Sequence, residues 1–267
     1  MDVRARGAVV TGGASGIGRA MALALARDGA RVVVADVDER GMDDVVRQIG
    51  ARGGQAVAVR TDVSDRAQVQ ALAARAFEVF GGVHVLCNNA GVVTHGGLEA
   101  ATHRDWQWVL GVNLWGVIHG IEAFVPRMIA QKAPGHIVNT ASMAGLIATR
   151  GLGVYNTSKY AVVGLSETLA KDLKPHRIGV SVLCPMGVET QIRAAGRNRP
   201  ESLKNEQEMA AEPVELIGRT LAPETVAEMV MAAIREDRLY VITHDEGLVP
   251  LRRRFERMEQ SIVDRKP

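Results

Sequence analysis

The chain has 267 residues, of which 47% are hydrophobic and 23% charged, and its formal net charge is +2 at pH 7. A chain of this length buries about three quarters of its unfolded surface, so we expect a single domain over residues 1–267. The near-neutral charge offers no basic surface for nucleic acid. No apolar run reaches the ~18 residues of a membrane span, and residues 1–4 do not start a secretory signal, so we expect no membrane partner.

Two cysteines, Cys87 and Cys184, lie far apart in the sequence, each at the end of an apolar run that is typical of a strand. Buried free thiols are expected there, which favours a reducing cytoplasm as the localisation. No cluster of cysteine and histidine has the spacing of metal ligands, so we predict no metal site.

The first predicted elements are a strand, a glycine-rich loop and a helix. Residues 7–10 are apolar, residues 11–18 contain the pattern Gly-x3-Gly-x-Gly, and an Ala/Leu-rich helix is predicted from about 16 to 27. Strand, glycine loop and helix are the context of a dinucleotide-binding turn. Small residues let backbone N–H groups approach a pyrophosphate at the helix N-terminus, where the helix dipole favours anions. The alternative is a tight turn without a ligand.

A second buried strand, residues 31–36, ends in Asp36, which lies 18 residues after Gly18. A carboxylate at this place can accept a hydrogen bond from the 2′-hydroxyl of an adenosine ribose, and it repels a 2′-phosphate. Neither Val37 nor Ser15 supplies a compensating cation. Asp36 therefore predicts NAD as the cofactor in preference to NADP, the alternative being a plain helix N-cap.

The middle of the chain continues the alternation of helices and strands. A polar helix over residues 39–52 and a strand over 55–60 come first, and Asp65 is predicted to cap a helix over 66–80. The apolar run 83–87 predicts the next strand.

Short polar and small residues follow that strand at 88–91, and they suit a loop that packs against a flat adenine ring. His95, in the loop beyond, is a candidate for the substrate pocket, although a solvated loop histidine is the simpler interpretation.

A long helical pattern spans residues 104–132 and contains Asn113 and Trp115. Asparagine is unfavourable inside a helix, where its side chain can instead hold water or bend the helix. Trp115 is expected in the core or at a subunit contact. The following strand, residues 135–140, delivers Ser142 at its carboxyl end.

The next predicted helix carries Tyr155 and Lys159, and it extends to about residue 173. Residues four apart share one helix face, so the ammonium can lie near the phenol oxygen. A free phenol has a pKa of about 10. A neighbouring positive charge favours the phenolate and lowers that pKa, which would make a general base for an alcohol proton. Ser142 could hydrogen-bond the same substrate oxygen.

The last third of the chain begins with a strand over residues 177–183. Residues 186–221 lose clear periodicity and are interpreted as a substrate lid with short helical pieces. A helix with proline at its first position follows at 223–236, then a strand at 239–243. A charged helix over 250–263 ends the chain, and its three consecutive arginines are interpreted as a solvated face or an inter-subunit contact.

Every candidate polar group in this reading follows the carboxyl end of a strand. Ligands of open parallel α/β sheets bind at that edge. The agreement is the strongest argument from the residues themselves for an active site.

These motifs, in this order, resemble the short-chain dehydrogenase/reductase family in its compact branch, over about residues 5–245. The resemblance implies an α/β fold of the Rossmann type, a doubly wound seven-stranded parallel sheet in a three-layer α/β/α domain. Members are usually homotetramers or homodimers, and the long helices carrying Asn113 and Tyr155 would form the main subunit contact.

The same resemblance implies roles for four residues. Tyr155 would be the catalytic acid/base, and Ser142 would orient the substrate oxygen. Lys159 would bind the nicotinamide ribose and lower the pKa of Tyr155, and Asn113 would hold a water that links Lys159 to solvent.

Further residues match the family's nucleotide contacts. Met186 stands where the family usually has glycine, which is displaced to Gly187, and this departure bears on the loop that follows. The implied cofactor-binding residues are Gly12, Ser15, Gly16, Ile17, Gly18, Asp36, Asp62, Val63, Asn89, Ala90, Gly91, Tyr155, Lys159, Pro185, Val188 and Thr190.

The leading interpretation is a short-chain NAD-dependent alcohol dehydrogenase or ketone reductase that interconverts a secondary alcohol and its ketone, with oxidation as the expected direction. Apolar residues in the lid favour an apolar or aromatic substrate. One alternative is a 3-oxoacyl-thioester reductase, which Asp36 disfavours because reductive biosynthesis generally uses NADP. The other is an NAD-binding sensor without turnover, for which a broken set of four catalytic residues would be expected.

Overall fold

The computed structural model describes residues 1–206 and 218–264. Its centre is one parallel sheet of seven strands in the order β3-β2-β1-β4-β5-β6-β7. The order reverses beside β1, which makes the sheet doubly wound and confirms the predicted fold class. The strands are β1 (Gly7–Thr11), β2 (Arg31–Asp36), β3 (Gln55–Arg60), β4 (Val85–Asn88), β5 (Gly135–Thr140), β6 (Ile178–Cys184) and β7 (Tyr240–Ile242).

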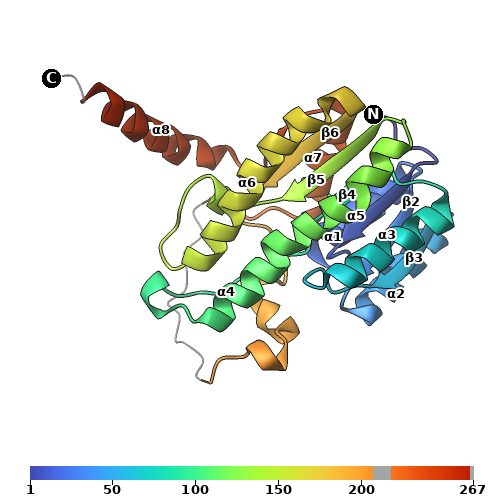
Figure 1. Cartoon of the computed structure of the whole chain (residues 1–267), viewed down its shortest axis with the longest axis horizontal. Helices are drawn as coiled ribbons and strands as arrows, with labels where there is room; N and C mark the ends of the chain where they lie inside the picture. Colours follow the sequence, from blue (N-terminus) through green and yellow to red (C-terminus); the bar gives the residue numbers. More distant parts are fainter. Residues whose placement is uncertain (207–217, 265–267) are drawn as a thin grey trace.

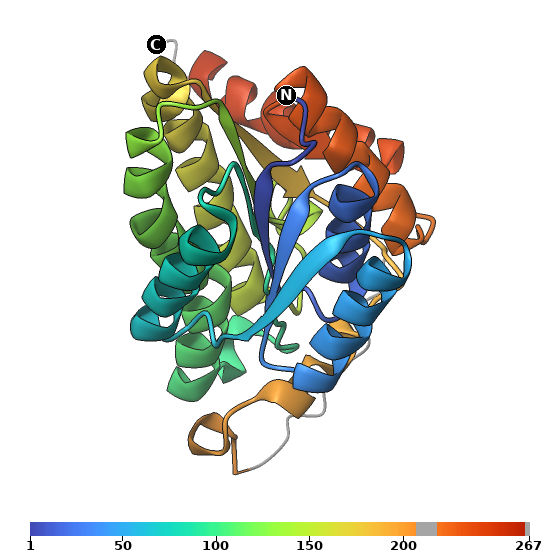
Figure 2. The same cartoon turned by 90° about the vertical axis from the view of Figure 1, so that its right-hand side faces the viewer.

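Helices cover both faces of this sheet, which gives the three layers visible in Figures 1 and 2. Helices α1, α2 and α7 pack on one face, and α3, α5 and α6 pack on the other. The α-helices are α1 (Gly16–Arg27), α2 (Glu39–Ala51), α3 (Arg66–Phe80), α4 (His103–Leu110), α5 (Gly116–Ala130), α6 (Gly153–Leu173), α7 (Pro223–Glu236) and α8 (Leu248–Val263).

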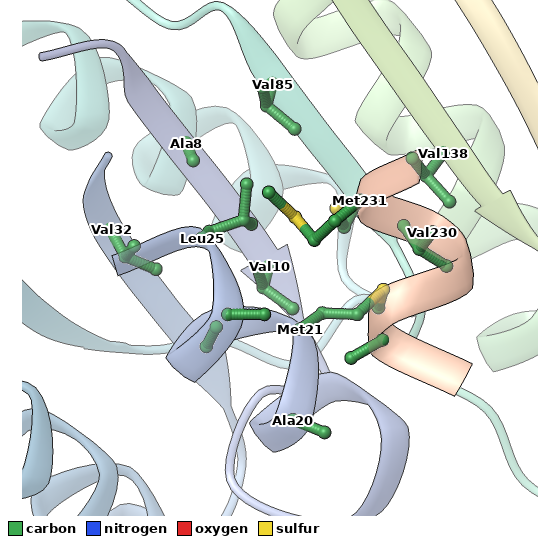
Figure 3. Packing of buried hydrophobic residues seen from close by; sticks show 14 of the residues in the cluster. Ala8, Val10, Ala20, Met21, Leu25, Val32, Val85, Val138, Val230 and Met231 are labelled. Carbon is green, nitrogen blue, oxygen red and sulfur yellow. The ribbon is translucent and has the colours of Figure 1, made fainter. Parts of the chain in front are cut away.

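The core follows from the two-residue period of the strands, because neighbouring side chains point to opposite faces of the sheet. Val10 faces α1 and α7, whereas its neighbour Val9 faces α3 and α5. On the first face, Met21 and Leu25 of α1 lie against Met231 of α7 (Figure 3). Both faces of the central strands are thus buried, which explains their continuous apolar sequences.

The helix predicted over residues 104–132 is interrupted. Helices α4 and α5 are joined by a π-helical turn, Gly111–Trp115, and Asn113 lies at its centre with no exposed surface. Asparagine thus disturbs the helix as its low propensity predicts. Trp115 is 52% exposed, so it is not a core residue, and its role at a subunit contact stays a prediction.

The joined segment His103–Ala130 also bears on membrane association. By length and composition alone, it is the one helical segment among residues 1–206 and 218–264 that could cross a membrane. Of its most apolar window, 56% is buried inside the fold, where α5 packs beside α3 and β4. Its apolar character therefore serves the core of the domain.

The predicted lid contains two short 3₁₀ helices, Ile192–Asn198 and Glu201–Leu203, as the sequence indicated. Residues 207–217 of the predicted lid lie outside the described residues. The described part is fixed to α4 by Arg199, whose Nη1 lies 2.8 Å from Oδ1 of Asp105 and whose guanidinium lies 4.9 Å from the Trp108 ring centroid. Both charged side chains are nearly buried, so this ion pair is a firm anchor for the segment.

The packing of α1 against α7 yields a stability prediction. Leu25→Ala removes a fully buried side chain and should lower the free energy of unfolding by about 2–5 kcal/mol in urea titration. Leu98→Ala is the matched control, because that leucine is mostly exposed and its loss should change stability by less than about 0.5 kcal/mol. Equal effects of the two substitutions would contradict this description of the core.

Candidate active site

The glycine loop leaves the start of α1 open to an anion. Ser15 is the N-cap residue of α1, and its hydroxyl makes no capping hydrogen bond. The first N–H groups of a helix have no partner within the helix, and here no side chain caps them. Gly12 has a φ of +64°, and a side chain at Gly18 would overlap the Gly12 carbonyl oxygen. The loop is therefore close-packed and presents backbone amides, the arrangement that binds a diphosphate.

Asp36, at the carboxyl end of β2, is held by three backbone amides. Its Oδ2 accepts a hydrogen bond from the Ala14 amide at 3.0 Å, and its Oδ1 accepts from Val37 at 2.7 Å and Asp38 at 3.1 Å. These bonds tie the carboxylate to the glycine loop and fix its direction. The plain N-cap alternative is wrong, because the N-cap of α2 is Asp38, whose side chain accepts from Gly41.

Asp38 lines the same cleft as Asp36 and was not singled out from the sequence. Two carboxylates at this end of the cleft oppose a 2′-phosphate more strongly than one. Arg60 lies opposite Asp36 in the sheet register, but its guanidinium pairs with Glu39 at 3.2 Å. The electrostatic preference for a 2′-hydroxyl therefore remains in the folded structure.

The loop after β4 closes the next part of the cleft. Asn89 donates from Nδ2 to the Thr11 carbonyl oxygen at 3.0 Å, and its Oδ1 accepts from the Thr140 hydroxyl at 3.2 Å. This one side chain thus joins the ends of β1 and β5. Beside it, the Val63 carbonyl oxygen is hydrogen-bonded to His119 of α5, and Asp62 accepts from Ser64.

Tyr155 and Lys159 project from one face of α6, as their spacing predicts. The Lys159 ammonium lies 5.6 Å from the Tyr155 ring centroid and donates a hydrogen bond to the Thr140 carbonyl oxygen at 2.8 Å. Lys159 is only 2% exposed and Tyr155 9% exposed. A turn approaches them closely, because a Cβ at Gly145 would lie 2.5 Å from the Lys159 carbonyl oxygen.

Burial opposes the predicted lowering of the Tyr155 pKa by Lys159. Burial raises the pKa of Tyr155 to about 12, and the nearby Ser142 hydroxyl opposes this rise only in part. Burial also lowers the pKa of Lys159 to about 8. Both groups respond mainly to the loss of water, which disfavours whichever form is charged. The phenol is therefore protonated at neutral pH.

Ser142 and Asn113 support this pair from two sides. Ser142 follows β5, and its Oγ accepts from the Ala144 amide at 3.1 Å and donates to the Pro185 carbonyl oxygen at 3.3 Å. Asn113 exchanges hydrogen bonds with the Val92 backbone, accepting at 2.8 Å and donating at 2.9 Å.

Nδ2 of Asn113 also donates to Ser158 at 3.1 Å, so both of its hydrogens are used within the protein. The predicted water relay therefore stays a prediction. What the structure shows is that the Asn113 side chain and the Lys159 ammonium both lie close to Gly91, where a Cβ would be 3.6 Å from each.

One continuous cleft joins these groups along the carboxyl edge of the sheet. Most of the predicted residues line it, whereas Asn113, Ser142 and Val188 are not among its lining residues, although Ser142 is half-buried next to the lining residue Ala141. Val188 pairs with Leu221 and packs on the core, so its contact with a nucleotide stays a prediction. The predicted residues that line the cleft are Gly12, Ser15, Gly16, Ile17, Gly18, Asp36, Asp62, Val63, Asn89, Ala90, Gly91, Tyr155, Lys159, Pro185 and Thr190.

The sequence indicated apolar lid residues such as Leu203 at the substrate, but it missed the helical part of the apolar side of the cleft. Trp108 and Val112 from the helical region, together with Ala195 and Leu203 from the lid, line it and pack with one another. Their spacing indicated core helices and lid packing, and no local signal distinguished a wall of the cleft. His95 is half-buried outside the lining, and burial lowers its pKa.

Met186, the departure from the family pattern, points away from this cleft. Together with Met143 it reaches Gly247, where a Cβ would lie 3.2 Å from the Met143 sulfur and 3.6 Å from the Met186 sulfur. The two methionines thus fill the space between the Ser142 turn and the start of α8. Among the residues that the structure describes, no group of three His, Cys, Asp or Glu side chains could hold a metal ion.

Comparison with known proteins agrees with this architecture. Residues 6–201 match the family model for short chain dehydrogenase. The chain therefore belongs to the short-chain dehydrogenase family, and its fold is that of an oxidoreductase of this family.

Three relatives illustrate the similarity. A C alpha-dehydrogenase from a Sphingobium species is 35% identical, over 98% of this chain and 87% of that protein. A 1-deoxy-11-beta-hydroxypentalenate dehydrogenase from Streptomyces exfoliatus is 36% identical, over 96% of this chain and 89% of that protein. The crystal structure of a Burkholderia phymatum family member in complex with NAD is 44% identical, with a TM-score of 0.94 over 98% of this chain and 96% of that chain.

The buried lysine predicts a pH-dependent stability. Between pH 8 and its ordinary pKa of 10.5, Lys159 is more protonated in the unfolded chain than in the folded one, so its contribution to stability rises with pH. Urea unfolding of the wild type and Lys159→Met should show the wild type gaining relative stability from pH 8 to pH 10, below the range where Tyr155 acts oppositely. Lys171→Met, at an exposed lysine of α6, is the control, and parallel curves for Lys159→Met would contradict the assignment.

Proposed function

We propose that this protein is an NAD(H)-dependent oxidoreductase that interconverts a secondary alcohol and its ketone. The observation that carries the proposal is the continuity of the cleft, which runs from Asp36 past the glycine loop to the buried Tyr155–Lys159 pair. One end suits an adenosine ribose and the other carries a proton donor and acceptor. The relatives named as dehydrogenases and the NAD complex of a similar structure support this reading.

The residues of the cleft fit NAD. The uncapped start of α1 would bind the diphosphate, Asp36 would accept from the adenosine ribose, and Asn89 to Gly91 would form the adenine wall. Lys159 would donate to the nicotinamide ribose. NAD, when bound, supplies the acceptor for the hydride that leaves the carbinol carbon.

Tyr155 is the group that handles the proton. The phenol donates a proton to a ketone oxygen in reduction, and its phenolate takes the hydroxyl proton in oxidation. Burial favours the protonated phenol in the structure, so the oxidative direction that we propose should accelerate as the pH rises, up to about pH 8, where Lys159 begins to lose its charge. Ser142 orients the substrate oxygen, and the Lys159 ammonium stabilises the developing alkoxide.

The substrate is proposed to be apolar or aromatic, such as an aryl carbinol, a hydroxysteroid or a terpenoid alcohol. Trp108, Ala195 and Leu203 give the substrate end of the cleft an apolar wall. Arg199 and Asp105 hold the lid residues of that wall in place. The name of the Streptomyces relative includes a hydroxypentalenate, and this supports an alicyclic alcohol as the substrate.

The setting of the enzyme is also proposed. Cys87 and Cys184 are both free and buried, as predicted, and this state suits the cytoplasm. A homotetramer, or a homodimer, would use the face of α5 and α6, where the exposed Trp115 would gain a partner.

The reaction class is tested by following NADH formation with a panel of aryl, steroid and polyol secondary alcohols. We expect turnover with at least one apolar alcohol and little with polyols. Preferential reduction of a 3-oxoacyl thioester would favour the reductase alternative. Binding of NAD without turnover of any substrate would favour the sensor alternative.

Tyr155→Phe tests the proton-transfer role. Loss of the hydroxyl should lower turnover by at least about a hundredfold, the scale of general acid–base catalysis, with NAD affinity nearly unchanged. Tyr160→Phe, one position after Lys159 on α6, is the control and should keep its activity. Substantial turnover in Tyr155→Phe would remove Tyr155 from the mechanism.

Asp36→Ser tests the choice of cofactor. Removing the carboxylate should weaken NAD binding and improve the use of NADP, so the ratio of kcat/KM for the two cofactors should fall at least about tenfold. Asp43→Ser removes the same charge from the exposed face of α2 and should leave the ratio unchanged. A wild-type enzyme that already uses both cofactors equally would contradict the role of Asp36.

A further inference from the structure

The last helix, α8, extends away from the body of the protein (Figure 1). It has 16 residues and none of them is buried. Near its middle, the Arg254 guanidinium lies 5.4 Å from the ring centroid of Tyr160 on α6. Helices of this length are marginally stable in water unless an apolar face is packed. Because none of its residues is buried, the part of α8 beyond Arg254 lacks a packing partner in this chain, and we expect it to be stabilised by one outside it.

Four of the apolar residues of α8 form one stripe. Leu251, Phe255, Met258 and Ile262 follow one another at intervals of 4, 3 and 4 residues, the spacing of a coiled-coil seam. Phe255 is 49% exposed, Met258 50% and Ile262 70%. Side chains of this kind are normally covered, and the alternation of 3 and 4 predicts that another helix covers them.

We propose that α8 pairs in antiparallel orientation with α8 of a second copy of this chain, about a two-fold axis between Phe255 and Met258. In this register Phe255 packs on the partner's Met258, and Leu251 packs on the partner's Ile262. Each contact occurs twice because the axis repeats it. The stripe is thus complementary to itself, layer by layer.

The charges beside the stripe agree with this register. Arg252 and Glu259 occupy equivalent positions on the same flank of the seam, each between two apolar layers. Antiparallel pairing places Arg252 next to the partner's Glu259, and the two-fold axis repeats the pair. Opposite charges therefore meet at both ends of the seam.

A parallel pair is less suitable. Paired helix axes lie 8–10 Å apart, so a parallel pair would bring two whole domains together at the same end. It would also need Arg254 to face the partner's Glu259, whereas Arg254 lies over Tyr160 of its own chain. The antiparallel pair separates the two domains by the helix length, roughly 24 Å at 1.5 Å per residue. This interface differs from the α5–α6 face proposed above and is independent of the proposed activity.

Disulfide trapping tests the register in the full chain. The double variant Leu251→Cys/Ile262→Cys should form a covalent dimer under mild oxidation, because each new thiol faces a different one in the partner. Cys87 and Cys184 are buried and should not compete. The two single variants are the controls and should stay monomeric on a non-reducing gel. No dimer in the double variant, or a dimer in Leu251→Cys alone, would overturn the antiparallel register.

Sedimentation tests whether the stripe carries assembly in solution. Phe255→Glu places a charge in the seam and should halve the mass of the assembly. Val263→Glu is the matched control, because Val263 is equally exposed but lies beside the seam, and its assembly should be unchanged. An unchanged mass for Phe255→Glu would overturn the proposal. So would wild-type binding to phosphatidylglycerol vesicles that Phe255→Glu abolishes while its mass stays the same, since that result assigns α8 to a membrane surface.

Exchanging the charges of Arg252 and Glu259 tests whether these two residues pair across the seam. Arg252→Glu alone creates two repelling pairs across the axis and should weaken self-association about tenfold. Arg252→Glu combined with Glu259→Arg restores opposite charges and should recover it. Failure of the second substitution to rescue would contradict the predicted pairs. Arg253→Glu, one residue away and off the seam, should have little effect.

Discussion

The burial of one ammonium group organises the site. Lys159 is almost fully enclosed, and its Nζ donates a hydrogen bond to the Thr140 carbonyl oxygen at the end of β5. A buried cation is disfavoured unless polar groups contact it, so the neighbouring backbone must approach Lys159 closely. Gly145 lets a turn reach the Lys159 backbone, and Gly91 lies beneath the ammonium. The turn that contains Gly145 begins at Ser142, and this places Ser142 close enough to Tyr155 to affect its pKa.

The second constraint is the parallel sheet. Because all seven strands run in one direction, their carboxyl ends supply the loops that hold the nucleotide site. Asn89 joins the ends of β1 and β5 by hydrogen bonds, and Asp36 joins the glycine loop to the end of β2. These side chains make several short loops into one rigid rim. A rim of this kind can position two reactants, which is a large part of catalysis.

Much of this was predictable from the sequence, because the signals are local. Apolar runs indicated the strands, and the family resemblance implied how they form one sheet. The glycine spacing indicated the diphosphate loop, and the four-residue spacing placed Tyr155 and Lys159 on one face. The confirmed cap of α3 by Asp65 is another local signal.

What the sequence did not reveal depends on packing between distant segments. The pKa of Tyr155 rises because water is excluded from it, and a helical spacing contains no information on burial. Three further features each involve residues far apart in the chain. They are the apolar wall with Trp108, the Arg199–Asp105 ion pair and the packing of Val188 against the core. Asp38 was overlooked because it is the N-cap residue of α2, and an N-cap aspartate looks the same in the sequence whether or not it also lines the cleft.

The most direct measurement is the titration of the Tyr155 phenol itself. Nuclear magnetic resonance of the tyrosine-labelled protein, with Tyr155→Phe to assign the signal, follows its ionisation as a function of pH. Because burial excludes water from the phenol, Tyr155 should remain protonated through pH 10 and ionise at about 12. Ionisation below the ordinary value of about 10 would show that the lysine charge outweighs burial, and it would contradict the account.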